Sequence, residues 1–197
     1  MVKEAVPTLI LASTSPYRRE LLGRLGVEFE TFAPEVDESL RANETPGDAG
    51  LRLACAKARA AAGQRADALI LAGDQLASFN GQPVGKPADT GTAEQYLEQF
   101  SGRILTYYTA IALLISGNDT PVTHLDESRV HLRPLDRDEI RRYVAKENPI
   151  DCAGGLKLES LGSALCERIE TEDPTALAGL PLIATARLLR EHGYALP

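Results

Sequence analysis

Apolar runs of strand length alternate in this chain with hydroxyl–proline pairs that start helices. The run at residues 8–12 leads into Ser15 and Pro16, and a second such pair opens the alanine-rich stretch 45–63. A hydroxyl side chain at the N-cap and a proline in the first helical turn are both favoured at a helix start. Another apolar run follows at 68–79. This order of strand and helix predicts an α/β fold.

The second half of the chain predicts that the sheet is mixed. The dipeptide Asn80-Gly81, directly after the run at 68–79, is typical of a tight hairpin turn, which joins antiparallel strands. A β-branched and aromatic run at 104–116 reaches a further strand at 121–133 through a glycine-containing turn. We therefore expect a mixed twisted sheet flanked by helices. The other expected elements are a strand at 27–34 and helices at about 91–100, 136–147 and 180–192.

Composition places the chain among ordinary globular proteins. With 197 residues, 44% of them hydrophobic, it is long enough for one domain with a full core, and we expect a single domain over 1–197. A formal net charge of −7 is not the basic footprint of a duplex-nucleic-acid binder, so any phosphate site has to be built locally. No apolar run approaches the roughly 20 residues of a membrane span, and the N-terminal run is too short for a signal peptide.

The three cysteines are odd in number and lack CxxC spacing. This pattern favours a reducing compartment and buried packing roles over a disulfide framework or a structural zinc. We expect a soluble cytoplasmic protein without nucleic-acid or membrane partners.

The first group of polar residues with a chemical meaning follows the strand at 8–12. A helix N-terminus presents free N–H groups and a positive dipole end, which suit a phosphate. Ser13, Thr14 and Ser15 could donate hydroxyl hydrogen bonds. Arg18 or Arg19 could bind phosphate oxygens with two hydrogen bonds. The alternative is a well-capped surface helix with solvated arginines.

Two further groups carry charge beside apolar segments. Asp74 comes directly after the run LILAG, and at a strand end it could hold a metal or activate water, although such an acid is also a common turn former. Lys86 supplies a cation on a stiff Gly-Lys-Pro loop, and Glu38 a second metal ligand. The Lys-x-Glu spacing of Lys157 and Glu159 places both side chains on one face of an extended segment, or else on a solvated edge.

Seven segments taken together resemble, in order and spacing, the Maf family of nucleotide pyrophosphatases. They are LILASTSPYRRELL, APEVDE, LACAKA, AGDQ, GKP, CAGGLKLESLG and LAGLPLIA. The resemblance covers nearly the whole chain. It implies a cytoplasmic α/β hydrolase of Maf/ITPase-like fold, with a cleft between two lobes. Such an enzyme uses a divalent metal cation, Mg²⁺ or Mn²⁺, to cut a nucleoside triphosphate between its α and β phosphates.

The resemblance also implies roles for individual residues. Asp74 matches the catalytic acid of the family, and Glu38 matches the acid that shares its metal site. The residues that match the family's polar and cationic phosphate-binding positions are Ser13, Arg18, Arg19, Lys57 and Lys86. An acidic protein would thereby hold an anionic substrate.

Three positions imply the base preference. The pyrimidine-cleaving branch of the family has arginine, threonine and glutamine where this chain has Tyr17, Gln75 and Glu159. Guanine presents adjacent N1–H and N2–H donors, which the carboxylate of Glu159 would accept. Methylation at N7 makes the ring cationic, and the aromatic face of Tyr17 would attract it. These residues resemble the YceF-type subfamily, the 7-methyl-GTP pyrophosphatases, and imply a modified nucleoside triphosphate as substrate.

The chain departs from the subfamily pattern at two of its positions. The usual aromatic at Tyr17 is tryptophan, and the family typically has glycine at Ser160. Two alternatives stay open: a dTTP/UTP pyrophosphatase, and a non-catalytic regulator of cell division that binds nucleotide or nucleic acid. Carboxylates beside an anion site favour catalysis over simple binding. The sequence is compatible with a homodimer and does not fix the oligomeric state.

Overall fold

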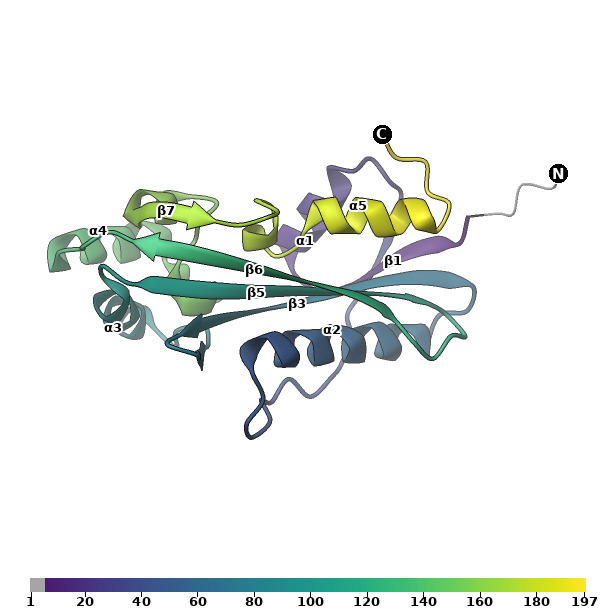
Figure 1. The fold of residues 1–197 in the computed structure, drawn as a ribbon, viewed down its shortest axis with the longest axis horizontal. Coiled ribbons are helices and arrows are strands. Elements are labelled where there is room, and N and C mark those ends of the chain that lie inside the picture. The colour runs from purple at the N-terminus through teal and green to yellow at the C-terminus, as the bar shows by residue number, and fades with distance from the viewer. Residues whose placement is uncertain (1–5) are drawn as a thin grey trace.

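The structure is a computed structural model that describes residues 6–197 (Figure 1). The first five residues of the predicted domain, which include the start of the segment judged too short for a signal peptide, lie outside the described residues. The helices and strands are β1 (Thr8–Ala12), α1 (Pro16–Gly23), β2 (Glu30–Phe32), α2 (Pro46–Ala62), β3 (Ala68–Phe79), β4 (Gln82–Val84), α3 (Thr90–Phe100), β5 (Ile104–Ile115), β6 (Val122–Leu132), α4 (Arg137–Glu147), β7 (Cys166–Glu170) and α5 (Leu182–Glu191). Four 3₁₀ turns, η1 (Pro149–Asp151), η2 (Ala153–Gly155), η3 (Leu161–Leu165) and η4 (Ala176–Ala178), connect the later elements.

A seven-stranded sheet forms the centre of the molecule, with strand order β2-β1-β3-β5-β6-β7 and β4 paired to β3. Strand β1 runs parallel to β2 and β3, whereas β3, β5, β6 and β7 are antiparallel to their neighbours. The prediction of a mixed sheet flanked by helices is therefore confirmed. The predicted hairpin joins β3 to β4, with Asn80 and Gly81 at φ angles of 51° and 78°.

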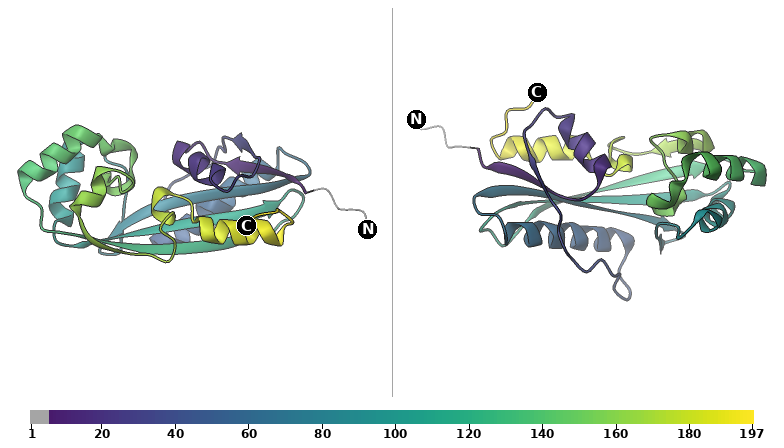
Figure 2. Two further views of the ribbon diagram at one scale, coloured as in Figure 1. Left: turned by 90° about the horizontal axis from the view of Figure 1, so that it is seen from above. Right: turned by 180° about the vertical axis from the view of Figure 1, so that it is seen from behind.

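The long strands β3, β5 and β6 pass through two lobes (Figures 1 and 2). In one lobe, α2 places small side chains such as Ala54 and Ala58 against Ile70 of β3. Helices α1 and α5 cover the opposite face of the sheet with leucines that include Leu22 and Leu188. In the other lobe a separate apolar cluster packs beneath α3 and α4. Both lobes thus share one continuous sheet.

One edge of β3 is open at the junction of the two lobes. Strand β1 pairs with β3 as far as Ala12 opposite Ala72, and β4 begins its pairing at Ala77. Among the described residues, 73–76 therefore have no strand partner on this edge. The prediction that Asp74 stands at the end of its own strand is wrong, because it lies near the middle of β3. The strand that ends beside it is β1.

The helix starts agree with the sequence, and several other segments differ from it. Ser15 and Thr45 cap α1 and α2, and Asp136 forms a capping box at the start of α4. The strand predicted at 27–34 is reduced to β2, and β7 was not predicted. In the part of the chain that the structure describes, every helix is too short or too polar to traverse a lipid bilayer.

Candidate active site

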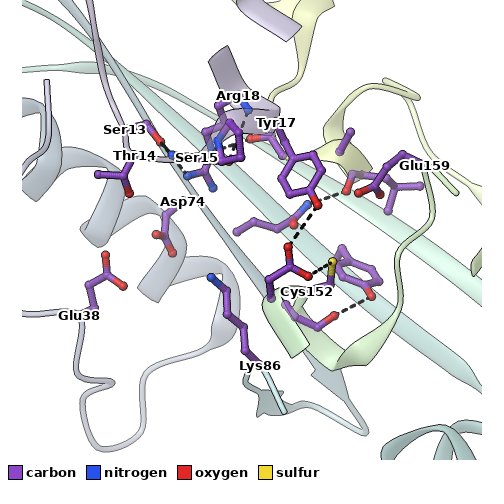
Figure 3. Close-up of a pocket in the computed structure, with 18 of the residues that line it drawn as sticks. Ser13, Thr14, Ser15, Tyr17, Arg18, Glu38, Asp74, Lys86, Cys152 and Glu159 are labelled. Carbon is purple, nitrogen blue, oxygen red and sulfur yellow. Dashed lines mark hydrogen bonds between the residues drawn. The ribbon is translucent and has the colours of Figure 1, made fainter. Parts of the chain in front are cut away.

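A pocket of about 380 Å³ lies at the open edge of β3, between the two lobes (Figure 3). Of the ten predicted site residues, nine line this pocket, and Arg19 is the one that does not. Glu38 and Asp74 lie toward one end, whereas Tyr17 and Glu159 lie toward the other. Successive side chains of a strand point to opposite faces. Asp74 consequently faces α2, and Gln75 faces the side of the sheet that carries α1 and η4.

Arg18 is held over the sheet by hydrogen bonds at the start of α1. Its Nε donates to the carbonyl oxygen of Gly179 at 2.8 Å, and one terminal nitrogen donates to Ser13 Oγ at 3.3 Å. A Cβ on Gly73 would lie 3.4 Å from Arg18 Nε, so the glycine leaves room for the guanidinium. Burial lowers the pKa of Arg18, opposed by the charges of Asp74 and Glu38. An arginine retains its positive charge under such conditions. Arg18 is therefore a fixed cation at the pocket wall.

Lys57 joins the two predicted metal ligands. Its ammonium nitrogen lies 2.6 Å from Oδ1 of Asp74 and 2.6 Å from Oε1 of Glu38. Lys57 and Asp74 are 8% and 7% exposed, whereas 62% of the Glu38 side chain is exposed. Burial raises the pKa of the Asp74 carboxyl, and the nearby Lys57 opposes this effect. The pocket thus holds a buried carboxylate whose affinity for a proton exceeds that of an exposed aspartate.

The loop that carries Glu38 is anchored to α2. Glu44 accepts two hydrogen bonds from Arg52, at 2.6 Å from Nε and 2.7 Å from a terminal nitrogen. The same terminal nitrogen of Arg52 donates to the carbonyl oxygen of Ser39 at 3.1 Å. The hydrogen bonds with Arg52 lower the pKa of Glu44 to about 2. Glu38 therefore projects from a loop that is fixed on its C-terminal side, at Ser39 and Glu44.

The donor set at this end suits a hard divalent cation. Glu38 and Asp74 offer carboxylate oxygens on either side of the Lys57 ammonium, so the local geometry already holds a positive charge between them. Mg²⁺ is commonly bound by one or two carboxylates, with substrate phosphate oxygens and waters completing the coordination. Within residues 6–197 there is no group of three or more His, Cys, Asp or Glu side chains that could hold a metal alone. Two carboxylates fit a metal that arrives with a phosphate ligand.

Tyr17 lies at the far end of the pocket and connects the two lobes. Its hydroxyl donates to Oδ2 of Asp151 at 3.2 Å, and the ammonium of Lys157 lies 5.8 Å from the centre of its ring. Burial raises the pKa of Tyr17, so its hydroxyl remains protonated. Glu159 is exposed and lines the same end. This end combines an aromatic ring with carboxylates.

Gln75 is oriented by groups in the pocket wall. Its Nε2 lies 3.0 Å from Thr109 Oγ1 and 3.0 Å and 3.1 Å from the carbonyl oxygens of Ala176 and Leu177. All three can accept hydrogen bonds, so the amide nitrogen is committed to the wall. The amide oxygen is the group that remains for a ligand.

The segment from η1 to the turn at Glu159 is fixed by buried tyrosines. The Tyr107 hydroxyl donates to the carbonyl oxygen of Ala153 at 3.0 Å. The Tyr143 hydroxyl donates to the carbonyl oxygen of Gly155 at 3.2 Å and accepts from the Lys157 N–H at 2.8 Å. The Lys-x-Glu stretch is a turn here, so the prediction of an extended segment is wrong. The turn is nevertheless held firmly against α4 and β5.

Ser160 continues this anchoring. Its hydroxyl donates to Glu147 Oε1 at 2.6 Å, and the N–H of Leu161 donates to the same oxygen at 3.2 Å. The φ angle of Ser160 is −134°, outside the left-handed region that favours glycine. A serine therefore fits at this position, and its side chain adds a contact between the turn and α4.

Comparison with known proteins places the chain in a family. The family model described as Maf-like protein matches residues 8–192. The chain belongs to the Maf family. It is 48% identical over 192 residues to the 7-methyl-GTP pyrophosphatase of Xanthomonas campestris pv. campestris (strain 8004), which covers 98% of this chain and 100% of the relative. It is 46% identical to the proteins of the same name from Albidiferax ferrireducens, over 94% of this chain and 93% of the relative, and from Thiobacillus denitrificans, over 95% and 93%.

Among solved structures, that of the Staphylococcus aureus Ham1 protein matches with a TM-score of 0.46 and 14% identity. The match covers 64% of this chain and 71% of that one. The family resemblance read from the seven sequence segments is confirmed by the family match and by the relatives.

Some pocket residues of this Maf chain were not predicted from the sequence, and two of them carry reactive groups. Asp151 and Cys152 line the pocket at the end that holds Tyr17. Burial raises the pKa of the Cys152 thiol to about 12, so the thiol is protonated at neutral pH. Cys55, Cys152 and Cys166 are half-buried, so the prediction that they are buried is wrong. The predicted packing role is confirmed for Cys55 and Cys166, which pack against apolar clusters. The quoted segment CAGGLKLESLG begins at Cys152, and Asp151 directly precedes it.

Proposed function

We propose that this Maf chain hydrolyses 7-methyl-GTP to 7-methyl-GMP and diphosphate. One observation carries the proposal. A single pocket holds an end with three cations, Arg18, Lys57 and Lys86, beside the carboxylate of Asp74, and an aromatic end, with Tyr17 and Glu159. A nucleoside triphosphate has the matching anionic and aromatic ends. Relatives at 46–48% identity that are named 7-methyl-GTP pyrophosphatases support the choice of substrate.

In this proposal the phosphates bind at the start of α1. Arg18 donates to phosphate oxygens, together with Lys86 from its loop and the hydroxyl of Ser13. Lys57 contributes positive charge from α2, next to the reacting phosphate. Charge-assisted hydrogen bonds of this kind are short and strong, and arginine suits planar, bidentate contacts with phosphate. Arg19 is exposed outside the pocket, so we assign the phosphate contact to Arg18.

Glu38 and Asp74 would hold the divalent cation, Mg²⁺ or Mn²⁺. When bound, such a cation neutralises charge on the phosphate oxygens and polarises the phosphorus. Lys57 keeps both carboxylates on one side of the pocket through its two 2.6 Å contacts. The loop anchor formed by Arg52 and Glu44 keeps Glu38 within reach.

The chain's own acid–base chemistry centres on Asp74. A water attacks the α phosphorus, and its oxygen becomes part of 7-methyl-GMP. Asp74 accepts the proton of that water, and the bond between the α phosphorus and the bridging oxygen breaks so that diphosphate leaves. The raised pKa of Asp74 makes it a stronger base than an exposed aspartate. Arg18, Lys57 and Lys86 balance the charge of the leaving diphosphate.

Recognition of the base falls to Glu159, Gln75 and Tyr17. The carboxylate of Glu159 accepts from the adjacent N1–H and N2–H donors of guanine, and the free amide oxygen of Gln75 is a second acceptor on this side. The ring of Tyr17 packs against the purine. Uracil and thymine present acceptor, donor and acceptor on their pairing edge, so a carboxylate suits them less well than an amide.

A panel of nucleoside triphosphates tests the proposal. Diphosphate release from 7-methyl-GTP, GTP, dTTP, UTP and ATP is measured with Mg²⁺ and with Mn²⁺, and Asp74→Asn serves as the background. We expect the highest kcat/KM with 7-methyl-GTP. A higher kcat/KM with dTTP or UTP would show that the enzyme is a pyrimidine-cleaving pyrophosphatase and not one that acts on 7-methyl-GTP. If no nucleotide were cleaved above background, the chain would be a nucleotide-binding regulator without catalysis.

We also propose that the enzyme acts in the cytoplasm, where nucleotides are present and unpaired cysteines persist. The single domain over 1–197 and the homodimer stay predictions, and light scattering of the full chain at several concentrations tests the latter.

A further inference from the structure

Asp151 is a pocket carboxylate that the proposed mechanism does not use. It ends the turn η1 in the lobe of α3 and α4, whereas its hydrogen-bond partner Tyr17 belongs to α1 in the other lobe. The oxygen atoms of Tyr17 and Asp151 are 3.2 Å apart across the end of the pocket that receives the base. Asp151 is exposed, so this contact is not needed to satisfy a buried group.

The ring of Tyr17 already has a cation near its face. The ammonium of Lys157 lies 5.8 Å from the ring centre, within the distance at which a cation is attracted by the electrons of an aromatic ring. A second cation on the opposite face would be repelled by the first. The aromatic ring alone is therefore a weak means of telling a cationic purine from a neutral one.

The two ends of the pocket have opposite charge. The phosphate end has three cations, Arg18, Lys57 and Lys86, against the two carboxylates of Glu38 and Asp74. The base end has two carboxylates, Asp151 and Glu159. Lys157 offsets part of this negative charge, and it in turn lies 4.0 Å from Glu147. Methylation at N7 makes guanine cationic while its phosphates stay anionic. The charge distribution of the pocket therefore matches a methylated guanine nucleotide better than a plain one.

We propose that Asp151 is a specificity-determining residue, whose carboxylate favours N7-methylated guanine over guanine by its charge. This inference rests on the proposed function, because it concerns the same pocket and substrate. Glu159 reads the N–H donors that both bases share, so the discrimination between them falls to Asp151 and the ring of Tyr17. The alternative is that Asp151 only orients Tyr17 through the hydroxyl contact.

Two variants separate charge from orientation. Asp151→Asn removes the charge and keeps an oxygen that accepts from the Tyr17 hydroxyl. Tyr17→Phe removes the hydroxyl contact and keeps both the ring and the charge. Asp119→Asn, in the exposed turn between β5 and β6, is the matched control for losing an aspartate charge outside the pocket.

The experiment measures the ratio of kcat/KM for 7-methyl-GTP to that for GTP. We expect Asp151→Asn to lower this ratio about two- to fivefold, the range for a partly exposed pair of charges. Tyr17→Phe should change it less, and Asp119→Asn should leave both substrates unchanged. The ratio of the wild type should also fall as ionic strength rises, because salt screens an exposed carboxylate. The ratio of Asp151→Asn should depend less on salt than that of the wild type, because Glu159 is then the only one of these two carboxylates that remains at the base end.

A binding measurement supplies a readout without turnover. Calorimetry of 7-methyl-GMP and GMP in the absence of metal should show the same loss of discrimination in Asp151→Asn. A wild type that prefers 7-methyl-GTP, with an unchanged ratio in Asp151→Asn, would overturn the role of Asp151 and leave the proposed function intact. A lower ratio in Tyr17→Phe together with an unchanged ratio in Asp151→Asn would show that orientation of the ring is the cause, because the asparagine keeps the acceptor for the hydroxyl. A wild type that cleaves neither guanine nucleotide would instead overturn the proposed function.

Discussion

The ammonium nitrogen of Lys57 in α2 lies 2.6 Å from Oδ1 of Asp74 in the middle of β3. This contact crosses from a helix to the sheet that it covers, beside the end of β1 where the ladder on β3 is interrupted. The buried carboxylate is therefore reachable from the pocket and paired with a cation before any ligand binds.

The first prediction concerns this carboxylate. Asp74→Asn should lower turnover of 7-methyl-GTP by about 10²-fold or more, because an amide neither accepts the proton of water nor holds a divalent cation as well. Thermal unfolding should show a folded protein, since the amide keeps an oxygen for Lys57. Asp138→Asn, an exposed position on α4, is the control. Near-normal turnover of Asp74→Asn would remove Asp74 from the mechanism.

The second prediction separates the adjacent arginines. Arg18→Ala should lower kcat/KM. The loss of transition-state stabilisation should be about 1.5–3 kcal/mol, which is usual when a hydrogen bond to a charged group is removed. For Arg19→Ala, the transition-state stabilisation should stay within about 0.5 kcal/mol of the wild-type value, because surface substitutions usually have small effects. Steady-state kinetics on both variants checks this. Equal losses in the two would mean that Arg19 reaches the substrate by a movement of α1.

The third prediction concerns the base. Glu159→Gln places an amide donor against a guanine donor. The transition-state stabilisation for 7-methyl-GTP should therefore fall by about 1–3 kcal/mol, while kcat/KM for UTP and dTTP should fall less or rise. Tyr17→Ala should narrow the preference for methylated over plain GTP, because only the methylated ring is cationic. Measurement of kcat/KM for 7-methyl-GTP, GTP, UTP and dTTP on the wild type and both variants tests this prediction. An equal loss on all four in Glu159→Gln would point to general damage at the turn.

The fourth prediction uses two glycines. A Cβ on Gly162 would overlap the backbone carbonyl oxygen of Lys157, whereas a Cβ on Gly23, at the end of α1, meets nothing within 4 Å. Gly162→Ala should lower the free energy of unfolding by about 1–3 kcal/mol, the cost of overpacking. Gly23→Ala should leave it unchanged or slightly raised. Urea unfolding compares them, and a Gly162→Ala protein as stable as Gly23→Ala would contradict the tight packing of this turn.

The fifth prediction concerns acid stability. Arg52 lowers the pKa of Glu44 to about 2 from a usual value of 4.5. As pH falls, the unfolded chain therefore binds this proton before the folded one, and the stabilising contribution is lost between 4.5 and about 2. The difference in unfolding free energy between wild type and Glu44→Gln should shrink across that range. Urea titrations at several pH values measure this difference, with Glu28→Gln, at an exposed loop position, as control. A difference that stays constant with pH would refute the effect.

Local signals in the sequence predicted most of the elements. The run ALILAGDQLASF predicted β3 to its ends, and the hydroxyl–proline pairs predicted the starts of α1 and α2. Strand β7 was missed because three of the five residues in its sequence CERIE are charged and most of its side chains are exposed, so it has no apolar run. The strand at 27–34 was too long because only residues 30–32 reach the edge of β1.

The site was predicted less completely, because it depends on pairings between distant segments. Nothing local to Asp74 reveals that β1 ends beside it, so a residue in mid-strand was taken for one at a strand end. The choice between Arg18 and Arg19 depends on the carbonyl of Gly179, more than 150 residues away along the chain. Asp151 could be assigned to the site only through its contact with Tyr17 across the pocket, which the sequence does not reveal.

Strands β3, β5 and β6 continue through both lobes as 12, 12 and 11 residues of hydrogen-bonded sheet. A molecule with two lobes joined by a linker can close by rotation about a hinge, but here a hinge would have to bend three strands at once. Within residues 6–197 the two lobes are therefore joined by continuous strands, and the sheet sets the distance between the phosphate end and the base end of the pocket. Substrates would be selected partly by their length between phosphate and base, before any side chain moves.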